Sequence, residues 1–224
     1  MSRLLFLGDS LMQENGPDTY PQTGWPQALK EFLRDPDTPI LDFAKNGRST
    51  KSFEDEGLLA IALEAACPGD IAFIGFGHND EKDDPSRHAD ARTDYLRNID
   101  RFRKALLEKG AKEVIVLTPI ARLRYGEGGE LLRTHGDYPS ALREHVGKEG
   151  IPLIDLEELT TLDLLAHSRA HNERHYMVLP PGKYPRYPEG KDDTTHLTEE
   201  GARWICSLVA EASQAIPSLS GIMK

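Results

Sequence analysis

Residues 3–8 read RLLFLG, a short apolar run that leads directly into the polar turn GDS at 8–10. Apolar runs of similar length recur at PILDFA (39–44), DIAFIGFG (70–77), EVIVLTPI (113–120) and IPLIDL (151–156). Short continuous apolar runs between turn residues are typical of parallel strands that are buried on both faces. The sequence therefore predicts an α/β fold with a central parallel sheet of about five strands.

Amphipathic segments lie between the apolar runs and have the pattern of helices. They are WPQALKEFLRD (25–35), FEDEGLLAIALEAA (53–66), TDYLRNIDRFRKALLEKG (93–110) and YPSALREHVGKEG (138–150). The last two end in glycine, which is a common helix stop. A closing helix through Ile205 and Val209 is expected after a threonine cap, at either Thr195 or Thr198. Because strands alternate with helices, we expect helices on both faces of the sheet.

Length and charge narrow the class of protein. The 224 residues suit a single domain, residues 1–224, and the formal net charge is −10 without any basic stripe. Nucleic acid and anionic membranes are therefore disfavoured as partners. The apolar run near the N-terminus is too short for a signal peptide or a membrane span, so we expect a cytoplasmic protein. The two cysteines, Cys67 and Cys206, are expected to be free thiols in the core.

Ligands of such sheets bind beyond the carboxyl ends of the strands. The polar residues expected there lie in Gly8–Ser10, Asn46–Ser49, Gly75–Asp80 and Thr118–Arg124. Ser10 follows the first strand and is a candidate nucleophile, which requires a general base and a group that orients the base. Asp193 and His196, three residues apart near the carboxyl end of the chain, offer both. The sequence therefore predicts a triad of Ser10, His196 and Asp193.

Attack by a nucleophilic serine on a carbonyl group produces an oxyanion, which needs hydrogen-bond donors. Gly47, after the second strand, has no side chain to block close approach to its N–H group. Asn79, after the third strand, has a side-chain amide that can donate. We expect these two groups and the Ser10 N–H to form an oxyanion hole.

Each segment also has an ordinary structural explanation. A GDS turn, an Asn-Gly turn and an aspartate before a helix are all common. The catalytic interpretation is favoured because the groups occur together, in chain order, at successive strand ends. Asp9 adjoins Ser10, but side chains one residue apart in a turn diverge, so we expect it to have a structural role through hydrogen bonds to nearby loop amides.

Two histidine-containing clusters are weaker candidates for function. His78, Asp80 and Asp83 are possible metal ligands by type, but their spacing fits neither a closed zinc site nor a calcium loop. The second cluster has fourfold spacing, which would align its members on one helix face as a polar rim over the site: His167, His171 and His175. We therefore expect no metal and no cofactor.

Four blocks of this sequence resemble those of the SGNH, or GDSL, hydrolase superfamily. The blocks are GDS at 8–10, Gly47, GxND at 77–80 and DxxH at 193–196. The resemblance implies a serine esterase with a three-layer α/β/α, flavodoxin-like fold and the triad and oxyanion roles given above. Longer segments, among them NGRSTKSF, VLTPIARLRY and LPPGKYPRYPEGKDDTTHL, are similar to bacterial rhamnogalacturonan acetylesterases, which remove acetyl groups from pectin backbone fragments.

The resemblance implies an acetylated oligosaccharide as substrate, and basic residues near the strand ends could meet its uronate carboxylates. The candidates for substrate binding are Arg48, Lys51, His78 and Arg122, with Arg124 as a second choice at the fourth strand. Alternatively, the basic residues pair with acidic residues of the chain. The other functions considered are a xylan-type acetylesterase, a GDSL lipase or thioesterase, and a non-catalytic carbohydrate-binding protein. The sequence leaves the oligomeric state open.

Overall fold

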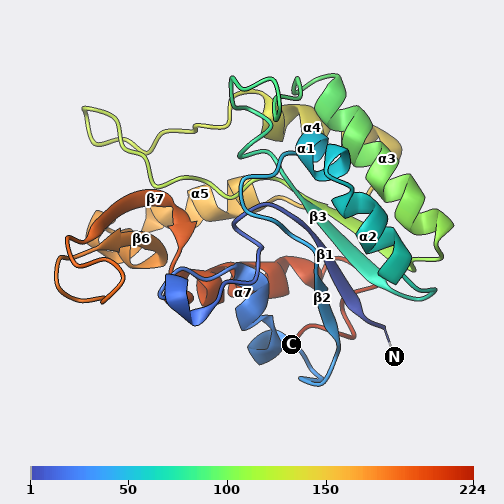
Figure 1. Cartoon of the computed structure of the whole chain (residues 1–224), viewed down its shortest axis with the longest axis horizontal. Coiled ribbons are helices and arrows are strands. Elements are labelled where there is room, and N and C mark those ends of the chain that lie inside the picture. The colour runs from blue at the N-terminus through green and yellow to red at the C-terminus, as the bar shows by residue number, and fades with distance from the viewer. Residues whose placement is uncertain (1) are drawn as a thin grey trace.

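A five-stranded parallel sheet forms the centre of the computed structural model, which describes residues 2–224 (Figure 1). Its strands are β1 (Leu4–Gly8), β2 (Ile40–Asp42), β3 (Ile71–Gly75), β4 (Glu113–Leu117) and β5 (Leu153–Ile154). All neighbouring pairs are parallel, and the order is β2-β1-β3-β4-β5. This is the flavodoxin-like order, so the predicted fold class is confirmed.

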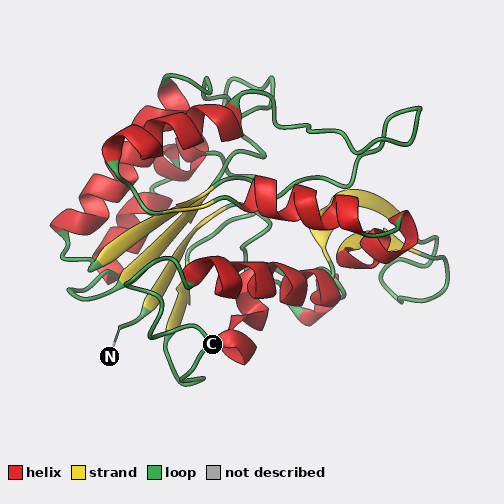
Figure 2. Cartoon of the chain, turned by 180° about the vertical axis from the view of Figure 1, so that it is seen from behind, coloured by secondary structure: helices red, strands yellow, loops and turns green. Residues whose placement is uncertain are grey.

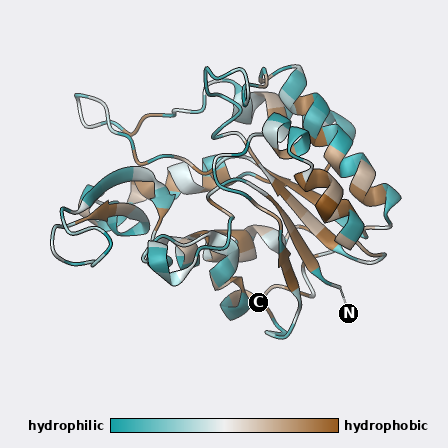
Figure 3. Ribbon diagram, in the orientation of Figure 1, coloured by the Kyte–Doolittle hydropathy of each residue, from teal (hydrophilic) through white to brown (hydrophobic). Residues whose placement is uncertain are grey.

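Side chains on alternate positions of β1 enter two separate cores. Leu4 and Phe6 pack on one face of the sheet, and Leu5 and Leu7 pack on the other. All four are fully buried, which explains why the strand is apolar at every position. Figure 3 shows the same feature as strands that are hydrophobic along most of their length, whereas most helices mix hydrophilic and hydrophobic residues.

Helices cover both faces of the sheet, giving three layers. The α-helices are α1 (Thr50–Asp55), α2 (Leu58–Ala65), α3 (Asp94–Glu108), α4 (Tyr138–Glu149), α5 (Leu156–Ala166), α6 (Arg169–Asn172) and α7 (Glu199–Ser213), and the 3₁₀ helices are η1 (Pro17–Thr19), η2 (Trp25–Phe32) and η3 (Glu173–His175). The group α1 to α4 lies on one face, whereas α5 and α7 run across the other (Figures 1 and 2).

The strand order reverses between β1 and β3. The chain passes from β1 outward to β2 and then back across β1 to β3. In sheets of this kind, ligands bind beyond the carboxyl ends of the strands at the point where the order reverses, which here is between β1 and β3. The segments that follow these two strands contain GDS (8–10) and GHND (77–80), so the fold brings together two of the blocks identified in the sequence.

An antiparallel hairpin beside the sheet was not anticipated from the sequence. It consists of β6 (Tyr176–Leu179) and β7 (Lys191–Leu197), and with its connecting loop it projects from the molecule (Figure 1). The hairpin matters for function because β7 contains Asp193 and His196.

Two expected helices differ in the structure. Residues 53–66 belong to two helices, because Gly57 adopts φ +76° between them, outside the helical range. The helix expected over 25–35 is a 3₁₀ helix, whose eight residues span about 16 Å rather than the roughly 12 Å of an α-helix.

Candidate active site

The turn after β1 presents Ser10 at the edge of the sheet. Gly8 is required there, because a Cβ atom on it would lie 2.4 Å from Met12 Sδ and 2.7 Å from the Gly75 carbonyl oxygen. The side chain of Asp9 turns inward and accepts a hydrogen bond from the Leu11 N–H at 3.0 Å. This confirms the structural position expected for Asp9, and it leaves Ser10 facing β7.

Ser10, His196 and Asp193 form a continuous chain of hydrogen bonds. Ser10 Oγ lies 3.0 Å from His196 Nε2, and His196 Nδ1 lies 2.8 Å from Asp193 Oδ2. A carboxylate accepts only, so Nδ1 is assigned the proton and Nε2 is free to accept the serine proton. The three groups predicted from distant parts of the sequence are thus brought together with the geometry of a nucleophile, a base and an orienting carboxylate.

The Asp193 carboxylate is held by more groups than His196 alone. Its Oδ1 accepts hydrogen bonds from the N–H groups of Thr195 and His196, both at 3.0 Å, and its Oδ2 lies 3.0 Å from Lys191 Nζ. Burial by itself would raise the pKa of Asp193, but the hydrogen bonds and charge of His196, together with Lys191, lower that pKa well below its ordinary value. Asp193 is therefore ionised at neutral pH.

Lys191 was not identified from the sequence. It lies two residues before Asp193 on the same strand, so both side chains point to the same face of the hairpin. This spacing of two residues would have indicated the contact between Lys191 and Asp193 only if β7 had been recognised as a strand. Its ammonium group also lies 5.2 Å from the centre of the Tyr187 ring, which connects the triad to the loop between β6 and β7.

Three donors expected to form the oxyanion hole lie in neighbouring segments. Among residues 2–224, no acceptor is found for the N–H of Ser10 or of Gly47. Gly47 has φ +77°, a conformation that favours glycine. The Asn79 amide donates to the Arg48 carbonyl oxygen at 3.1 Å and keeps a second N–H free. That contact places Asn79 directly beside the Gly47 turn.

His78 is buried and makes two hydrogen bonds to protein groups. Its Nδ1 lies 3.1 Å from Asp9 Oδ2, and its Nε2 donates to the Ile120 carbonyl oxygen at 3.0 Å. The residue is 5% exposed, and burial lowers its pKa. The expectation that His78 contacts substrate is therefore corrected. The same contacts leave no ring nitrogen for a metal ion shared with Asp80, whose carboxylate faces Thr50 instead.

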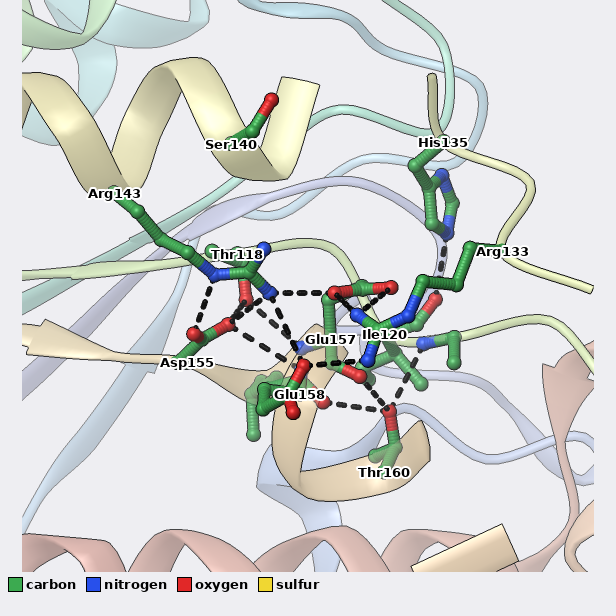
Figure 4. Close-up of polar contacts among 12 residues, drawn as sticks. Thr118, Ile120, Arg133, His135, Ser140, Arg143, Asp155, Glu157, Glu158 and Thr160 are labelled. Carbon is green, nitrogen blue, oxygen red and sulfur yellow. Dashed lines mark hydrogen bonds and ion pairs between the residues drawn. The ribbon is translucent and has the colours of Figure 1, made fainter. Parts of the chain in front are cut away.

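A polar cluster beyond β4 and β5 anchors the segment that supplies the Ile120 carbonyl group (Figure 4). Arg143 binds Asp155 at 2.6 and 2.9 Å, and Arg133 binds the buried Glu157 at 2.7 and 3.0 Å. Next to them, His135 Nε2 donates to the same Ile120 oxygen at 2.9 Å. These contacts fix the long connection between β4 and α4 against the sheet.

The basic residues proposed to bind substrate are held by other protein groups. Arg48 forms an ion pair with Glu56 at 2.6 Å, and Lys51 donates to the Pro85 carbonyl oxygen. Arg122 is paired with Glu81 and is only 12% exposed. For Arg48 and Arg122 the alternative, pairing with acidic residues of the chain, describes the structure better. Lys51 is held by a backbone carbonyl group and not by an acidic residue. Arg124 differs, because it is exposed and no hydrogen bond or ion pair of its side chain is found within residues 2–224.

His167, His171 and His175 do not lie on one helix face, so that prediction is wrong. The helix α5 ends at Ala166, and His167 has an extended backbone. The rings nevertheless form a row that ends on Trp204, with centroid separations of 4.4, 5.2 and 4.6 Å. His175 is buried within this row, and burial lowers its pKa to about 4.

Two further expectations concerned the cysteines and membrane-spanning segments. Cys206 is buried as expected, whereas Cys67 is exposed, so the prediction of two core thiols is wrong for Cys67. Within the described part of the chain, none of the helices is both long enough and apolar enough to cross a bilayer.

Comparison with protein families gives one match that covers most of the chain. The model of the "GDSL-like Lipase/Acylhydrolase family" matches residues 6–204. The rhamnogalacturonan acetylesterase RhgT of Bacillus subtilis is 32% identical over 214 residues, which cover 96% of this chain and 90% of RhgT. The probable rhamnogalacturonan acetylesterase YesY of the same organism is 32% identical over 226 residues, covering 100% and 98%.

Solved structures share the fold at lower identity. The protein YXIM of Bacillus subtilis superposes with a TM-score of 0.78 at 22% identity, over 97% of this chain and 58% of that longer chain. The acetylxylan esterase Axe2 of Geobacillus stearothermophilus superposes with a TM-score of 0.61 at 17% identity, over 94% and 93%. At these identities the similarity shows the fold.

Proposed function

The chain belongs to the GDSL-like lipase/acylhydrolase family and is a carboxylic ester hydrolase, and on that premise we propose that Ser10, His196 and Asp193 are its catalytic triad. The observation that supports this most directly is the hydrogen-bond chain from Ser10 Oγ through both nitrogens of His196 to Asp193, at 3.0 and 2.8 Å. It offers a nucleophile, a base and an orienting carboxylate at the strand ends where ligands of this fold bind.

The proposed reaction has two halves. Ser10 Oγ attacks the carbonyl carbon of the ester while its proton passes to His196 Nε2. The oxyanion accepts hydrogen bonds from the N–H groups of Ser10 and Gly47 and from the Asn79 amide. His196 then gives the proton to the departing alcohol, leaving an acyl group on Ser10. In the second half His196 takes a proton from water as the water oxygen attacks the acyl carbon. His196 then returns that proton to Ser10 Oγ as the bond between the acyl carbon and Ser10 Oγ breaks, which releases the acid and regenerates Ser10 and neutral His196.

We propose that the ester is an acetyl group on a sugar, and that the substrate is an acetylated rhamnogalacturonan oligosaccharide. Support comes from two relatives with that activity in their names, each matched over nearly the whole of both chains. A polar setting also suits a sugar ester, because the loop after β6 (180–190) is rich in proline and charged residues.

The test combines substrate choice with active-site variants. Acetate release is measured on acetylated rhamnogalacturonan and acetylated xylan, and hydrolysis of 4-nitrophenyl esters is measured with increasing acyl length. We expect faster release from rhamnogalacturonan and a decline beyond short acyl groups. Ser10→Ala should reduce kcat by about 10⁴-fold or more and abolish labelling by a serine-directed phosphonate.

Ser140→Ala serves as the matched control, since Ser140 is exposed at the start of α4 and donates only to the Asp137 carbonyl oxygen. It should retain wild-type rates. Retained activity in Ser10→Ala would contradict the triad. A preference for xylan would assign another sugar, and a preference for long acyl chains would assign a lipase or thioesterase.

A further inference from the structure

The three proposed oxyanion donors come from three separate segments, none of which is held by the strand ladder. Ser10, Gly47 and Asn79 all lie beyond the last paired residue of their strands. An oxyanion hole works only if its donors keep their positions relative to one another, because a shift of about 1 Å can cost roughly 100-fold in rate. Some other contacts must therefore fix the spacing.

The two residues that flank Asn79 make such contacts in different directions. His78 is 5% exposed and Asp80 is 0% exposed, so neither side chain can meet a substrate. His78 reaches the turn that contains Ser10, and Asp80 reaches the segment that follows Gly47. The neighbours of Asn79 in the chain therefore connect it to the segments of both other donors: His78 to the Ser10 turn, and Asp80 to the segment after Gly47.

The first link joins His78 to Asp9. Asp9 is 2% exposed; its Oδ2 faces His78, and its Oδ1 accepts a hydrogen bond from the Leu11 N–H. Asp9 and Leu11 are the two chain neighbours of Ser10, so the Asp9 carboxyl group holds the turn on both sides of Ser10. His78 Nε2 must have a proton because it faces the Ile120 carbonyl oxygen. Nδ1 faces a carboxyl oxygen at 3.1 Å, so the pair must share one further proton, either on Nδ1 or on Asp9.

The second link joins Asp80 to Thr50. Asp80 Oδ1 accepts from the Thr50 N–H at 2.9 Å and from the Thr50 hydroxyl at 2.5 Å. The hydroxyl oxygen in turn accepts from the Asn98 amide of α3 at 3.0 Å. Thr50 is fully buried, begins α1 and lies three residues after Gly47, so its position determines where the Gly47 turn stands.

We propose that His78 and Asp80 are positioning residues that set the distances of the Asn79 amide from the N–H groups of Ser10 and Gly47. The proposal rests on the oxyanion hole of the proposed function. Neither residue touches the substrate, and both act through Asn79. Their loss should therefore lower kcat and leave KM unchanged, because the donors matter in the transition state rather than in substrate binding.

Thr50→Val tests the second link with little change in shape. The substitution removes the hydrogen bond from the Thr50 hydroxyl to Asp80 and keeps the hydrogen bond from the backbone N–H of residue 50 to the same carboxylate. We expect kcat for 4-nitrophenyl acetate to fall about 10-fold with KM unchanged, and Thr50→Ser to recover most of the loss. Thr161→Val is the matched control, since Thr161 is 4% exposed on α5 and its hydroxyl has no partner in the described residues. The control should keep the wild-type kcat.

Asp9→Asn and Asp9→Leu test the first link, and they keep the proposal testable if Thr50→Val does not fold. The asparagine can still accept from Leu11 and can donate to a neutral His78, whereas the leucine can do neither. Asp9→Leu should therefore lose about 10-fold more kcat than Asp9→Asn. Equal losses in the two variants would overturn the link.

Repeating Thr50→Val in an Asn79→Ala background separates positioning from general structural damage. Asn79→Ala alone should lower kcat by about 100- to 1,000-fold. If Thr50 acts through Asn79, its substitution should then change kcat by less than about twofold. A full additional 10-fold loss would overturn the positioning role. If Asn79→Ala itself keeps the wild-type kcat, the oxyanion hole of the proposed function fails instead.

Discussion

The chemistry of single residues depends on which partners the fold gives them. Ser10 and His196 lie 186 positions apart in the chain, yet their side chains meet at 3.0 Å. Arg48 is next to Gly47 in the chain, but its guanidinium is paired with Glu56. Nearness in sequence to a proposed catalytic group therefore does not leave a charge free to meet a substrate, and an unpaired charge close to the proposed triad is the better candidate.

Arg124 meets that criterion and leads to a prediction about substrate charge. The Leu123 N–H donates to the Thr194 carbonyl oxygen at 2.9 Å, which places the exposed Arg124 beside β7 and the triad. Arg124→Gln should raise KM for acetylated rhamnogalacturonan oligosaccharides by about 3- to 10-fold, because a charged hydrogen bond to a uronate is lost. Added salt should reduce the difference.

Two controls accompany this measurement. 4-Nitrophenyl acetate has no carboxylate, so its KM should not change in Arg124→Gln. Arg97→Gln, which alters an exposed arginine on α3 that is paired with Asp94, should leave both substrates unaffected. An equal rise in KM for both substrates in Arg124→Gln would show damage to the site rather than loss of a charge contact.

At the scale of elements, the positions of Asp193 and His196 in the proposed triad depend on how β7 passes into α7. Thr198 is the N-cap of α7: its hydroxyl accepts from the Gly201 N–H at 3.1 Å and donates to the Arg174 carbonyl oxygen at 2.6 Å. Of the two threonines considered from the sequence, Thr198 is the cap. Thr198, two residues after His196, therefore starts the helix and also ties it to the segment before β6.

Thr198→Ala should lower the free energy of unfolding by about 1–2 kcal/mol, because the cap and a buried hydrogen bond are lost together. Thr195→Ala is the matched control, since Thr195 is the other candidate cap and the helix does not use it. It should cost less than about half as much. Urea denaturation of the two variants measures the difference, and equal losses would contradict the assignment of the cap.

At the scale of the whole molecule, two carboxyl groups couple the free energy of unfolding to pH: the half-buried Asp42 and the fully buried Asp80. Burial raises the pKa of Asp42 on the edge strand β2 to about 7, although the Ala44 N–H partly opposes the shift. Burial likewise raises the pKa of Asp80 to about 7. In the unfolded chain such groups ionise near pH 4. Because their folded pKa is raised, they favour the folded state below about pH 4, and that stability is lost as the pH rises towards 7.

Asp42→Asn should therefore flatten the decline of stability between about pH 4 and pH 7, by on the order of 2–4 kcal/mol across that range. Asparagine can still accept from the Ala44 N–H, so the native contact at 2.8 Å is preserved. The measurement is the free energy of unfolding in urea at a series of pH values. Asp37→Asn, at an exposed carboxylate, should run parallel to wild type, and a parallel curve for Asp42→Asn would contradict the prediction.

The central sheet could be predicted from the sequence because its signals are local. Each of the five strands is a short apolar run, and Gly110 and Gly150 end their helices in conformations with positive φ. The residues of the candidate site could be predicted for a related reason. In a parallel sheet all carboxyl ends meet at one edge, so the position of Ser10 and Asn79 within four residues of a strand end already places them near that edge.

Only the tertiary structure decided the features that depend on distant partners. The strand β7, KDDTTHL, has no apolar alternation, and it is extended because it pairs with β6 and packs beside the sheet. The same holds for the charges: whether Arg48 or Arg124 is free depends on which carboxylate the folded chain brings within reach. His78 and Asp80 are polar residues in a loop by sequence, and their burial against Asp9 and Thr50 is a property of the packed strand ends alone.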